Sequence, residues 1–248
     1  MQEERFTFKY YTKLVDTMLL NGYSIANYDN YENFEKVCIF RHDVDYDIQK
    51  AKEFAIFESK ICDNLSSTYF ILLSSDFYNV FSLNSLRAIE TIINSGHEIG
   101  LHFDETKYII NNNEELFKEL VEEELFLLEK AIGKEIKVVS MHRPSKFILE
   151  RDIKFDKAIN SYSRKFFKEF KYISDSRMNW REDVISLIES KKFNKLHLLT
   201  HPFWYSEKEG TTKERLFQFI DRARYERYSY LSENFSKLEE FVTKEELF

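Results

Sequence analysis

Short apolar runs rich in β-branched and aromatic residues recur along the chain and are separated by segments with helical spacing. The runs predict strands over 36–44, 67–73, 98–103, 136–141, 171–174 and 195–200. In the other segments apolar residues recur every three or four positions, which predicts helices over 47–61, 85–95, 114–132, 212–226 and 232–247. Strands that alternate with helices predict an α/β fold with a mainly parallel sheet.

The length of the chain, 248 residues, is enough for one large core. No linker, internal repeat or low-complexity segment divides the sequence, so we expect one domain over 1–248, with a motif-bearing core over about 36–205 and C-terminal helices over 212–247. No glycine-rich turn follows the first strand, which argues against a dinucleotide fingerprint or a phosphate loop.

The charge and apolar content narrow the partners and the compartment. The formal net charge is −7 and no basic face stands out, so we expect no nucleic acid as a partner. No apolar stretch approaches the roughly 20 residues that span a bilayer. The N-terminal residues lack the apolar core of a signal peptide, and Cys38 and Cys62 have no metal or redox spacing. We therefore expect a cytoplasmic protein with free thiols.

Candidate chemistry gathers where predicted strands end. All six histidines lie in four short segments, 40–45, 97–104, 141–145 and 197–204. The carboxyl ends of parallel strands meet at one edge of an α/β sheet or barrel, where such folds place their active sites. Imidazole and carboxylate groups at that edge are typical of a metal site or an acid–base site.

The alternation of side chains along a strand sorts these residues by face. Asp43 and Asp45 share one face, with backbones roughly 7 Å apart, while His42 points to the other. Such a pair suits a division of labour between cation binding and proton transfer, but two turn or capping residues ahead of a helix at Asp47 explain it equally well. His102 and Asp104 likewise share a face at the end of the strand over 98–103.

Other candidates follow later strands. Arg143, after His142, is placed either to orient a carboxylate or to bind an anion, or it is a surface arginine ahead of a turn proline. His201 precedes Pro202, which cannot continue a ladder, so His201 is expected at the rim; His197 lies deeper and is expected in the core.

Three residues are candidates for contacts with substrate beside Asp104. Asp175 and Trp180 would form a polar wall and an aromatic platform for a sugar ring, although a helix cap and a core tryptophan explain them nearly as well. Trp204, close to His201, is the third.

The order of these motifs resembles the polysaccharide deacetylase family, the NodB-homology or carbohydrate esterase 4 enzymes. The resembling segments are Arg-His-Asp-Val-Asp at 41–45, Gly-His-Glu-Ile-Gly-Leu-His at 96–102, Arg143-Pro144, Ser174-Asp175-Ser176 with Trp180, and Leu-Leu-Thr-His at 198–201. The resemblance covers about 36–205 and implies a distorted (β/α) barrel of about six to seven strands.

The resemblance also implies roles for five residues. Asp43 matches the catalytic base, and Asp45 matches a metal-binding aspartate. His102 matches a metal ligand, Arg143 an arginine that steadies the base, and His201 the general acid.

Two positions depart from the family pattern. The usual adjacent aspartates are separated here by Val44, which still leaves both carboxylates on one face. The family's second metal histidine comes four residues after the first, where this chain has Thr106. The third ligand must therefore come from His142, Asp104 or His201. We favour His142, with Asp104 as a partner of a ligand rather than a ligand itself.

The sequence thus favours a divalent-metal-dependent hydrolase that removes an N-acetyl or other acyl group from a sugar or polysaccharide precursor. The mixed nitrogen and oxygen ligands suit Zn²⁺ first, then Mn²⁺, Co²⁺ or Ni²⁺. One alternative is another metal-dependent hydrolase, acting on a cyclic amide or a phosphoester. The other is a catalytically lapsed deacetylase-like domain that binds a glycan or a partner, which the threonine at Thr106 motivates.

Overall fold

The computed structural model describes residues 5–247 of the chain. These residues belong to two compact units, Met1–Glu207 and Lys208–Phe248. Every candidate site residue lies in the first unit, as does the whole motif-bearing segment. The single domain expected over 1–248 stays a prediction.

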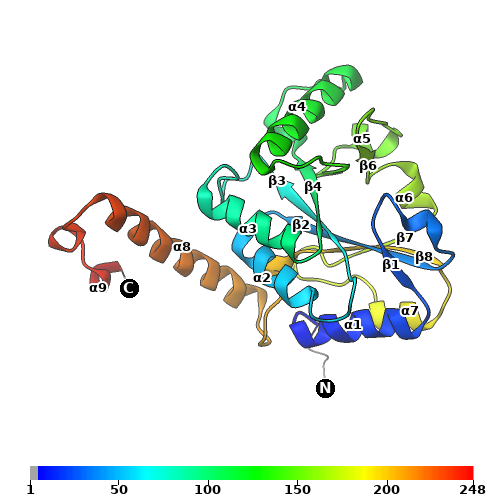
Figure 1. Cartoon of the computed structure of the whole chain (residues 1–248), viewed down its shortest axis with the longest axis horizontal. Helices are drawn as coiled ribbons and strands as arrows, with labels where there is room; N and C mark the ends of the chain where they lie inside the picture. The colour runs from blue at the N-terminus through cyan, green and yellow to red at the C-terminus, as the bar shows by residue number, and fades with distance from the viewer. Residues whose placement is uncertain (1–4, 248) are drawn as a thin grey trace. The chain divides into compact units, whose positions relative to one another are not determined.

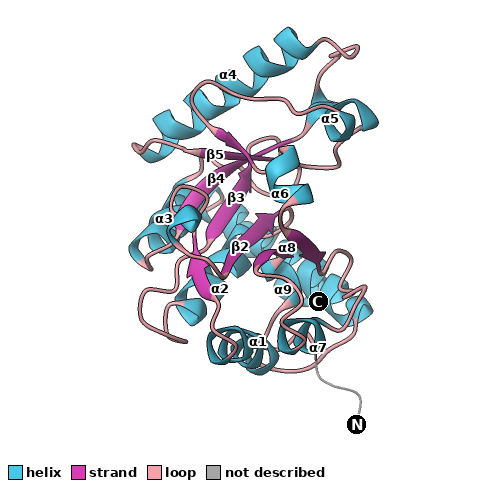
Figure 2. Cartoon of the chain, turned by 90° about the vertical axis from the view of Figure 1, so that its right-hand side faces the viewer, coloured by secondary structure: helices cyan, strands magenta, loops and turns pink. Residues whose placement is uncertain are grey.

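A curled sheet of parallel strands forms the centre of the first unit (Figures 1 and 2). The hydrogen-bonded order is β6-β5-β4-β3-β2-β8-β7, with β1 paired to β2 beside this path. All pairings are parallel, and the curl produces a half-barrel, which confirms the predicted α/β class and distorted (β/α) barrel. The strands are β1 (Ser24–Ala26), β2 (Val37–Val44), β3 (Thr68–Leu72), β4 (Glu98–Phe103), β5 (Val138–Met141), β6 (Ile159–Asn160), β7 (Lys171–Ser174) and β8 (Lys195–Thr200).

Helices connect the strands and cover the sheet (Figure 1). Those of the first unit are α1 (Phe8–Leu20), α2 (Ile48–Glu58), α3 (Leu83–Asn94), α4 (Glu114–Ile132), α5 (Lys146–Glu150), α6 (Arg164–Lys168) and α7 (Val184–Glu189). Short 3-10 turns are η1 (Tyr31–Asn33), η2 (Glu105–Lys107) and η3 (Pro202–Trp204). All six predicted strands are present, and α2, α3 and α4 match the predicted helices closely.

The helix ends follow the expected chemistry. The Asp47 carboxylate accepts hydrogen bonds from the backbone N–H groups of Gln49 and Lys50 and so caps α2. Since Asp47 alone satisfies these groups, Asp43 and Asp45 are not needed as caps. Gly96 and Gly133 follow α3 and α4 with φ of 93° and 68°, the left-handed region that favours glycine.

The second unit contains α8 (Thr212–Asn234), the 3-10 turn η4 (Leu238–Glu240) and α9 (Lys244–Leu247). The predicted helix over 212–226 therefore continues to Asn234, and the predicted single helix over 232–247 is wrong. Phe235 has an extended backbone, and the Tyr228 hydroxyl bonds the Val242 carbonyl across the bend. Within residues 5–247, no helix is both long and apolar enough to cross a membrane.

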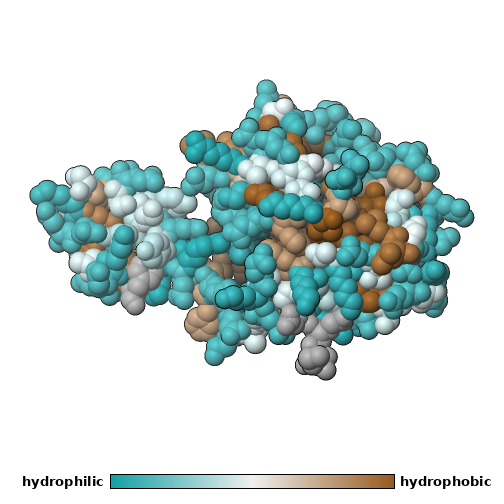
Figure 3. Space-filling model, turned by 60° about the horizontal axis from the view of Figure 1, so that its bottom comes forward, coloured by the Kyte–Doolittle hydropathy of each residue, from teal (hydrophilic) through white to brown (hydrophobic). Residues whose placement is uncertain are grey.

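Apolar side chains pack against both faces of the sheet. The molecular surface in the view of Figure 3 is mostly hydrophilic. Every residue of β2 is buried, as expected for a central parallel strand. Cys38 is a buried free thiol within β2, and Cys62 is a half-buried one, which confirms the expectation of unpaired cysteines.

A buried carboxylate organises the polar part of this core. Glu58, at the end of α2, accepts hydrogen bonds from the hydroxyls of Tyr11 (2.5 Å), Ser67 (2.7 Å) and Tyr69 (2.8 Å). The Nε2 atom of His42 lies 3.0 Å from the same carboxylate. His42, the neighbour of Asp43 on β2, thus packs into the core, as the alternation of side chains predicts. We call these residues the Glu58 cluster.

The Glu58 cluster makes the free energy of unfolding depend on pH in the acidic range. Burial raises the pKa of Glu58, but His42, His97 and the Tyr11 hydroxyl outweigh it and lower the pKa to about 2. In the unfolded chain a glutamate titrates near pH ~4.3. The stabilisation is therefore complete above that pH and is lost as the pH falls through about 2.

Glu58 contributes about 3 kcal/mol at pH 7, and we expect about 2 kcal/mol of it to be lost when the free energy of unfolding is measured in urea from pH 7 down to pH 2.5. Glu58→Gln is expected to lose this contribution at pH 7. In this variant the free energy of unfolding should therefore fall less steeply with decreasing pH. Glu53→Gln, on the same helix with a half-exposed side chain, is the matched control. A free energy of unfolding that falls equally steeply with decreasing pH in Glu58→Gln and in wild type would contradict this assignment.

Candidate metal centre

The carboxyl ends of β2, β4, β5 and β8 surround a cleft of about 790 Å³. This is the edge of the sheet at which the sequence places the site. The cleft is lined by four residues that the sequence predicts for the site: Asp43, Asp45, His102 and His201. Their order in the sheet explains the convergence, because β2 lies between β3 and β8 and β4 follows β3.

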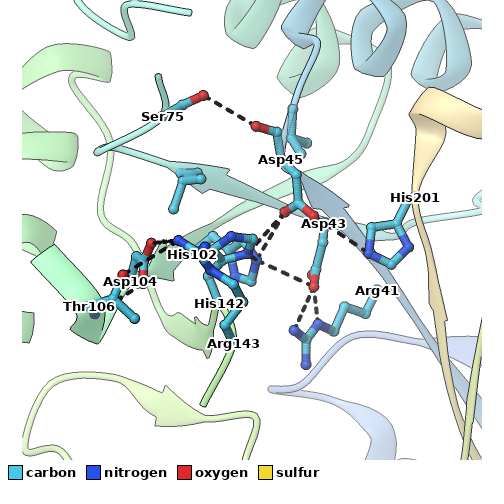
Figure 4. A network of polar contacts seen from close by, with 12 residues as sticks. Arg41, Asp43, Asp45, Ser75, His102, Asp104, Thr106, His142, Arg143 and His201 are labelled. Atoms are coloured by element: carbon cyan, nitrogen blue, oxygen red, sulfur yellow. Dashed lines mark hydrogen bonds and ion pairs between the residues drawn. The ribbon is translucent and has the colours of Figure 1, made fainter. Parts of the chain in front are cut away.

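Three side chains from three strands meet in the cleft (Figure 4). Asp45 Oδ1 lies 3.2 Å from His102 Nε2 and 3.4 Å from His142 Nδ1. The two imidazole nitrogens are 3.2 Å apart. One ligand atom from each residue falls within 4.8 Å of the others, so the set favoured from the sequence is brought together.

The atoms of this trio suit a bound cation. Asp45 Oδ1 is buried, and neither ring meets it with the geometry of a hydrogen bond; no other group of residues 5–247 does so. Burial raises the pKa of Asp45, but His102 and His142 hold it well below its usual range, so the carboxylate is ionised. Two imidazoles and one carboxylate with space beside them are a set of side chains that can hold a divalent cation.

The position of Asp45 is set by its backbone. It lies one residue beyond β2, and its carbonyl accepts a hydrogen bond from the Ser75 hydroxyl at 3.2 Å (Figure 4). The carbonyl of Val44 accepts another from the Tyr78 hydroxyl at 2.6 Å. The loop after β3 therefore holds the end of β2 in place and keeps the Asp45 carboxylate aimed at the histidines.

Asp43 is held by an arginine other than the one expected. Arg41 Nε and Nη2 donate to the two Asp43 carboxylate oxygens, each at 2.7 Å, and both residues are buried. Burial raises the pKa of Asp43, but Arg41 outweighs it and lowers the pKa. The alternation that pairs Asp43 with Asp45 also places Arg41 on that face, a signal available in the sequence.

Arg143 does not orient Asp43. It follows β5 with a left-handed φ of 52°, and its guanidinium donates to Asp104 Oδ2 at 2.5 Å. Its side chain is 63% exposed. Asp104 also accepts hydrogen bonds from the backbone N–H of Thr106 (3.1 Å) and from its hydroxyl (2.7 Å). Both Asp104 and Arg143 line the cleft, and Thr106 is committed to Asp104 rather than to the metal trio.

His201 is positioned by a buried carboxylate. Asp175 accepts hydrogen bonds from the His201 backbone N–H at 3.0 Å and from Nδ1 at 2.6 Å. Burial disfavours the charged imidazole, but Asp175 outweighs it and raises the pKa of His201 to about 9. The free Nε2 lies 3.8 Å from Asp45 Oδ2. Asp175 itself is fully buried and does not line the cleft, so the expected polar wall for substrate is corrected to a partner of His201.

The two tryptophans take different places. Trp180 is buried, stacks with Phe6 at 6.5 Å and does not line the cleft, so it is a core residue rather than a sugar platform. Trp204 does line the cleft and contacts Tyr46, with ring centroids 6.2 Å apart. The cleft also contains Tyr162 and Tyr172, which the sequence analysis missed because a tyrosine inside a loop or strand carries no distinguishing spacing.

The remaining histidines belong to the core. His197 is fully buried, its Nε2 lies 2.6 Å from the Tyr28 hydroxyl, and burial lowers its pKa to about 3. His97 is also buried and reaches Glu58 at 3.5 Å. Neither lines the cleft, in agreement with the prediction for His197.

No family model and no curated protein matches the chain. Among solved structures it is similar to the Xyl-CE4 domain of a multidomain xylanase from the hindgut metagenome of Trinervitermes trinervoides, with 13% identity, a TM-score of 0.41, and coverage of 78% of this chain and 85% of that chain. Peptidoglycan deacetylase PdaC from Bacillus subtilis has 13% identity, a TM-score of 0.39 and coverage of 84% and 98%. A carbohydrate esterase family 4 pseudoenzyme from Bacillus anthracis has 14% identity and a TM-score of 0.39, with coverage of 77% of this chain and 62% of that chain.

The resemblance to the polysaccharide deacetylase family therefore rests on the motifs at 41–45, 96–102 and 198–201. At these identities and TM-scores, however, the chemistry has to be argued from the geometry of the site.

The trio predicts a measurable metal content. Protein purified without a chelating tag is expected to hold close to one divalent ion per chain, determined by inductively coupled plasma mass spectrometry. Asp45→Ala and His102→Ala each remove one of three ligands and are expected to reduce this to a small fraction. Asp76→Ala, which removes an 84% exposed aspartate of the same cleft, is the matched control. Equal metal content in all four proteins would refute the site.

Proposed function

We propose that this protein is a divalent-metal-dependent hydrolase that removes an N-acetyl or other acyl group from a sugar. The observation that carries the proposal is the arrangement around Asp45, His102 and His142. Beside this trio stand a carboxylate fixed by a buried arginine and an imidazole fixed by a buried carboxylate. Acyl transfer to water needs a base, an electrophile and an acid within reach of one bound acyl group.

Asp43 is proposed as the base. Arg41 binds both carboxylate oxygens edge-on, which fixes the plane of the group and leaves lone pairs facing the cleft. Asp43 Oδ2 is also 3.5 Å from His102 Nε2, so the carboxylate reaches the space beside the proposed ion. There it can accept the proton of an attacking water.

His201 is proposed as the acid. Asp175 occupies Nδ1 and so leaves Nε2, the nitrogen that faces the cleft, to carry the proton that can be given away. A pKa raised to about 9 keeps the imidazole protonated near neutral pH, as a donor to a leaving amine must be. Asp43 and His201 thus stand in opposite protonation states across the same trio.

Asp45, His102 and His142 would hold the ion. A bound divalent cation supplies Lewis acidity, which polarises an acyl carbonyl and makes a water more acidic. Zn²⁺ suits two imidazoles and a carboxylate best, with Mn²⁺, Co²⁺ or Ni²⁺ as further candidates. The sugar as substrate class follows from the resemblance of the motifs, and Trp204, Tyr46, Tyr162 and Tyr172 offer aromatic faces of the kind that pack against sugar rings.

A second candidate function is binding without catalysis. Thr106 stands where the related family has its second metal histidine, and its hydroxyl is occupied by Asp104. If His142 does not replace that ligand, the cleft would bind an acylated glycan without hydrolysing it. Metal content and acetate release separate the two candidates.

We expect zinc-loaded protein to release acetate from an N-acetylglucosamine pentamer. Asp43→Asn keeps the shape of the side chain but cannot take a proton, and His201→Gln cannot give one. Each is expected to lower kcat/KM by about a hundredfold or more while metal content stays near wild type. Asp63→Asn, an exposed aspartate outside the cleft, is the control.

Thermal unfolding of each variant shows whether a loss of turnover reflects a loss of fold. Near-normal turnover in folded Asp43→Asn would contradict the assignment of the base. Metal-loaded wild type that binds acetylated sugars without releasing acetate would favour the binding domain.

A further inference from the structure

Two arginines of the cleft have no acidic partner. The other two cations that line it, Lys107 and Arg143, each contact an aspartate, at 3.3 and 2.5 Å. Arg177 and Arg181 form no ion pair and no hydrogen bond with any of residues 5–247, and both are exposed. Their guanidinium groups are therefore available to a ligand in the cleft.

The charges around the cleft are balanced until an ion binds. The chain carries a formal net charge of −7, yet the four carboxylates that line the cleft are matched by four cations, and Arg41 behind Asp43 is matched by Asp175 behind His201. A divalent ion at Asp45, His102 and His142 would make the cleft positive. Burial and the charge of Asp45 raise the pKa of Tyr46, and the charges of Arg143 and Arg177 partly offset this. Such a field attracts anions.

The segment that bears the two arginines is anchored at both ends. Asp175 is buried under His201, and Trp180 is buried against Phe6. Between them, Arg177 and the next residue both have a left-handed backbone, with φ of 60° and 56°. Residues other than glycine adopt this conformation at a cost in free energy. Such strain persists where the surrounding structure fixes it, most often at functional sites. Arg181 follows Trp180 directly.

We infer that the sugar substrate carries an anionic group, phosphoryl or carboxylate, which Arg177 and Arg181 bind at the wall of the cleft. The inference rests on the proposed function and specifies its substrate class. A guanidinium presents a planar fork of donors that matches both kinds of anion. The same two residues would have no counter-charge in a complex with a neutral polymer. The phosphoryl group of an activated sugar and the carboxylate of an acidic sugar are the two sources of this chemistry.

The test compares three ligands on zinc-loaded protein by isothermal titration calorimetry. N-acetylglucosamine is neutral, N-acetylglucosamine phosphate carries a phosphoryl group, and N-acetylmuramic acid carries a carboxylate. At least one anionic sugar is expected to bind about tenfold or more tightly than the neutral one, because a charge-assisted hydrogen bond contributes about that factor. Which of the two gains the preference identifies the source of the anion.

The double variant Arg177→Gln/Arg181→Gln is expected to reduce the ratio of the two dissociation constants towards unity. Arg177→Lys/Arg181→Lys should retain part of it, since lysine keeps the charge without the fork. Arg87→Gln, an exposed arginine of α3 outside the cleft, should keep the full ratio. Because a phosphoryl group can also contact the ion, a preference that persists in the double glutamine variant would overturn the role of the arginines.

The outcomes separate this inference from the proposed function. Wild type that holds metal and releases acetate, yet binds all three sugars equally, would overturn the inference and leave the hydrolase standing. Wild type without metal or acetate release that still prefers an anionic sugar through the two arginines would support the inference and overturn the hydrolase.

Discussion

The site depends on the alternation of side chains along one strand. Every residue of β2 is buried, and β2 pairs with β1, β3 and β8, so its register cannot slip without moving the whole sheet. On one face it carries Arg41 and Asp43 towards the cleft, and on the other His42 towards Glu58. The edge of the sheet that lines the cleft and the polar core are therefore fixed by the same eight residues.

The buried charges of the site are largely neutralised before any ligand binds. Arg41 with Asp43 and Asp175 with His201 are ion pairs whose partners were brought out of water together. A buried charge left alone is strongly destabilising, so each pair restricts its members to one arrangement. Asp45 is the exception, because its Oδ1 faces two imidazole nitrogens without a hydrogen bond. This asymmetry distinguishes the proposed metal ligand Asp45 from the buried carboxylates that already have a cationic partner.

Much of this architecture could be predicted from periodicity, and the failures have physical causes. The strand ends, the shared face of Asp43 and Asp45, and the meeting of His102 with His142 follow from alternation and parallel topology. Arg143 and Trp180 lie beyond strand ends, where loop backbone decides the direction of a side chain; the φ of 52° at Arg143 is invisible in sequence. The helix α1 was missed although its buried face has helical spacing, whereas β6, with two residues, exists only through its neighbour β5.

X-ray absorption spectroscopy at the metal edge, on protein that retains the ion acquired in the cell, tests the central claim most directly. The account predicts a first shell of two imidazole nitrogens and carboxylate or water oxygens, at about 2.0–2.2 Å for zinc. Multiple scattering from imidazole would identify the histidines. A shell of oxygen atoms alone, or one containing sulfur from Cys38 or Cys62, would show that the ion is not held by Asp45, His102 and His142.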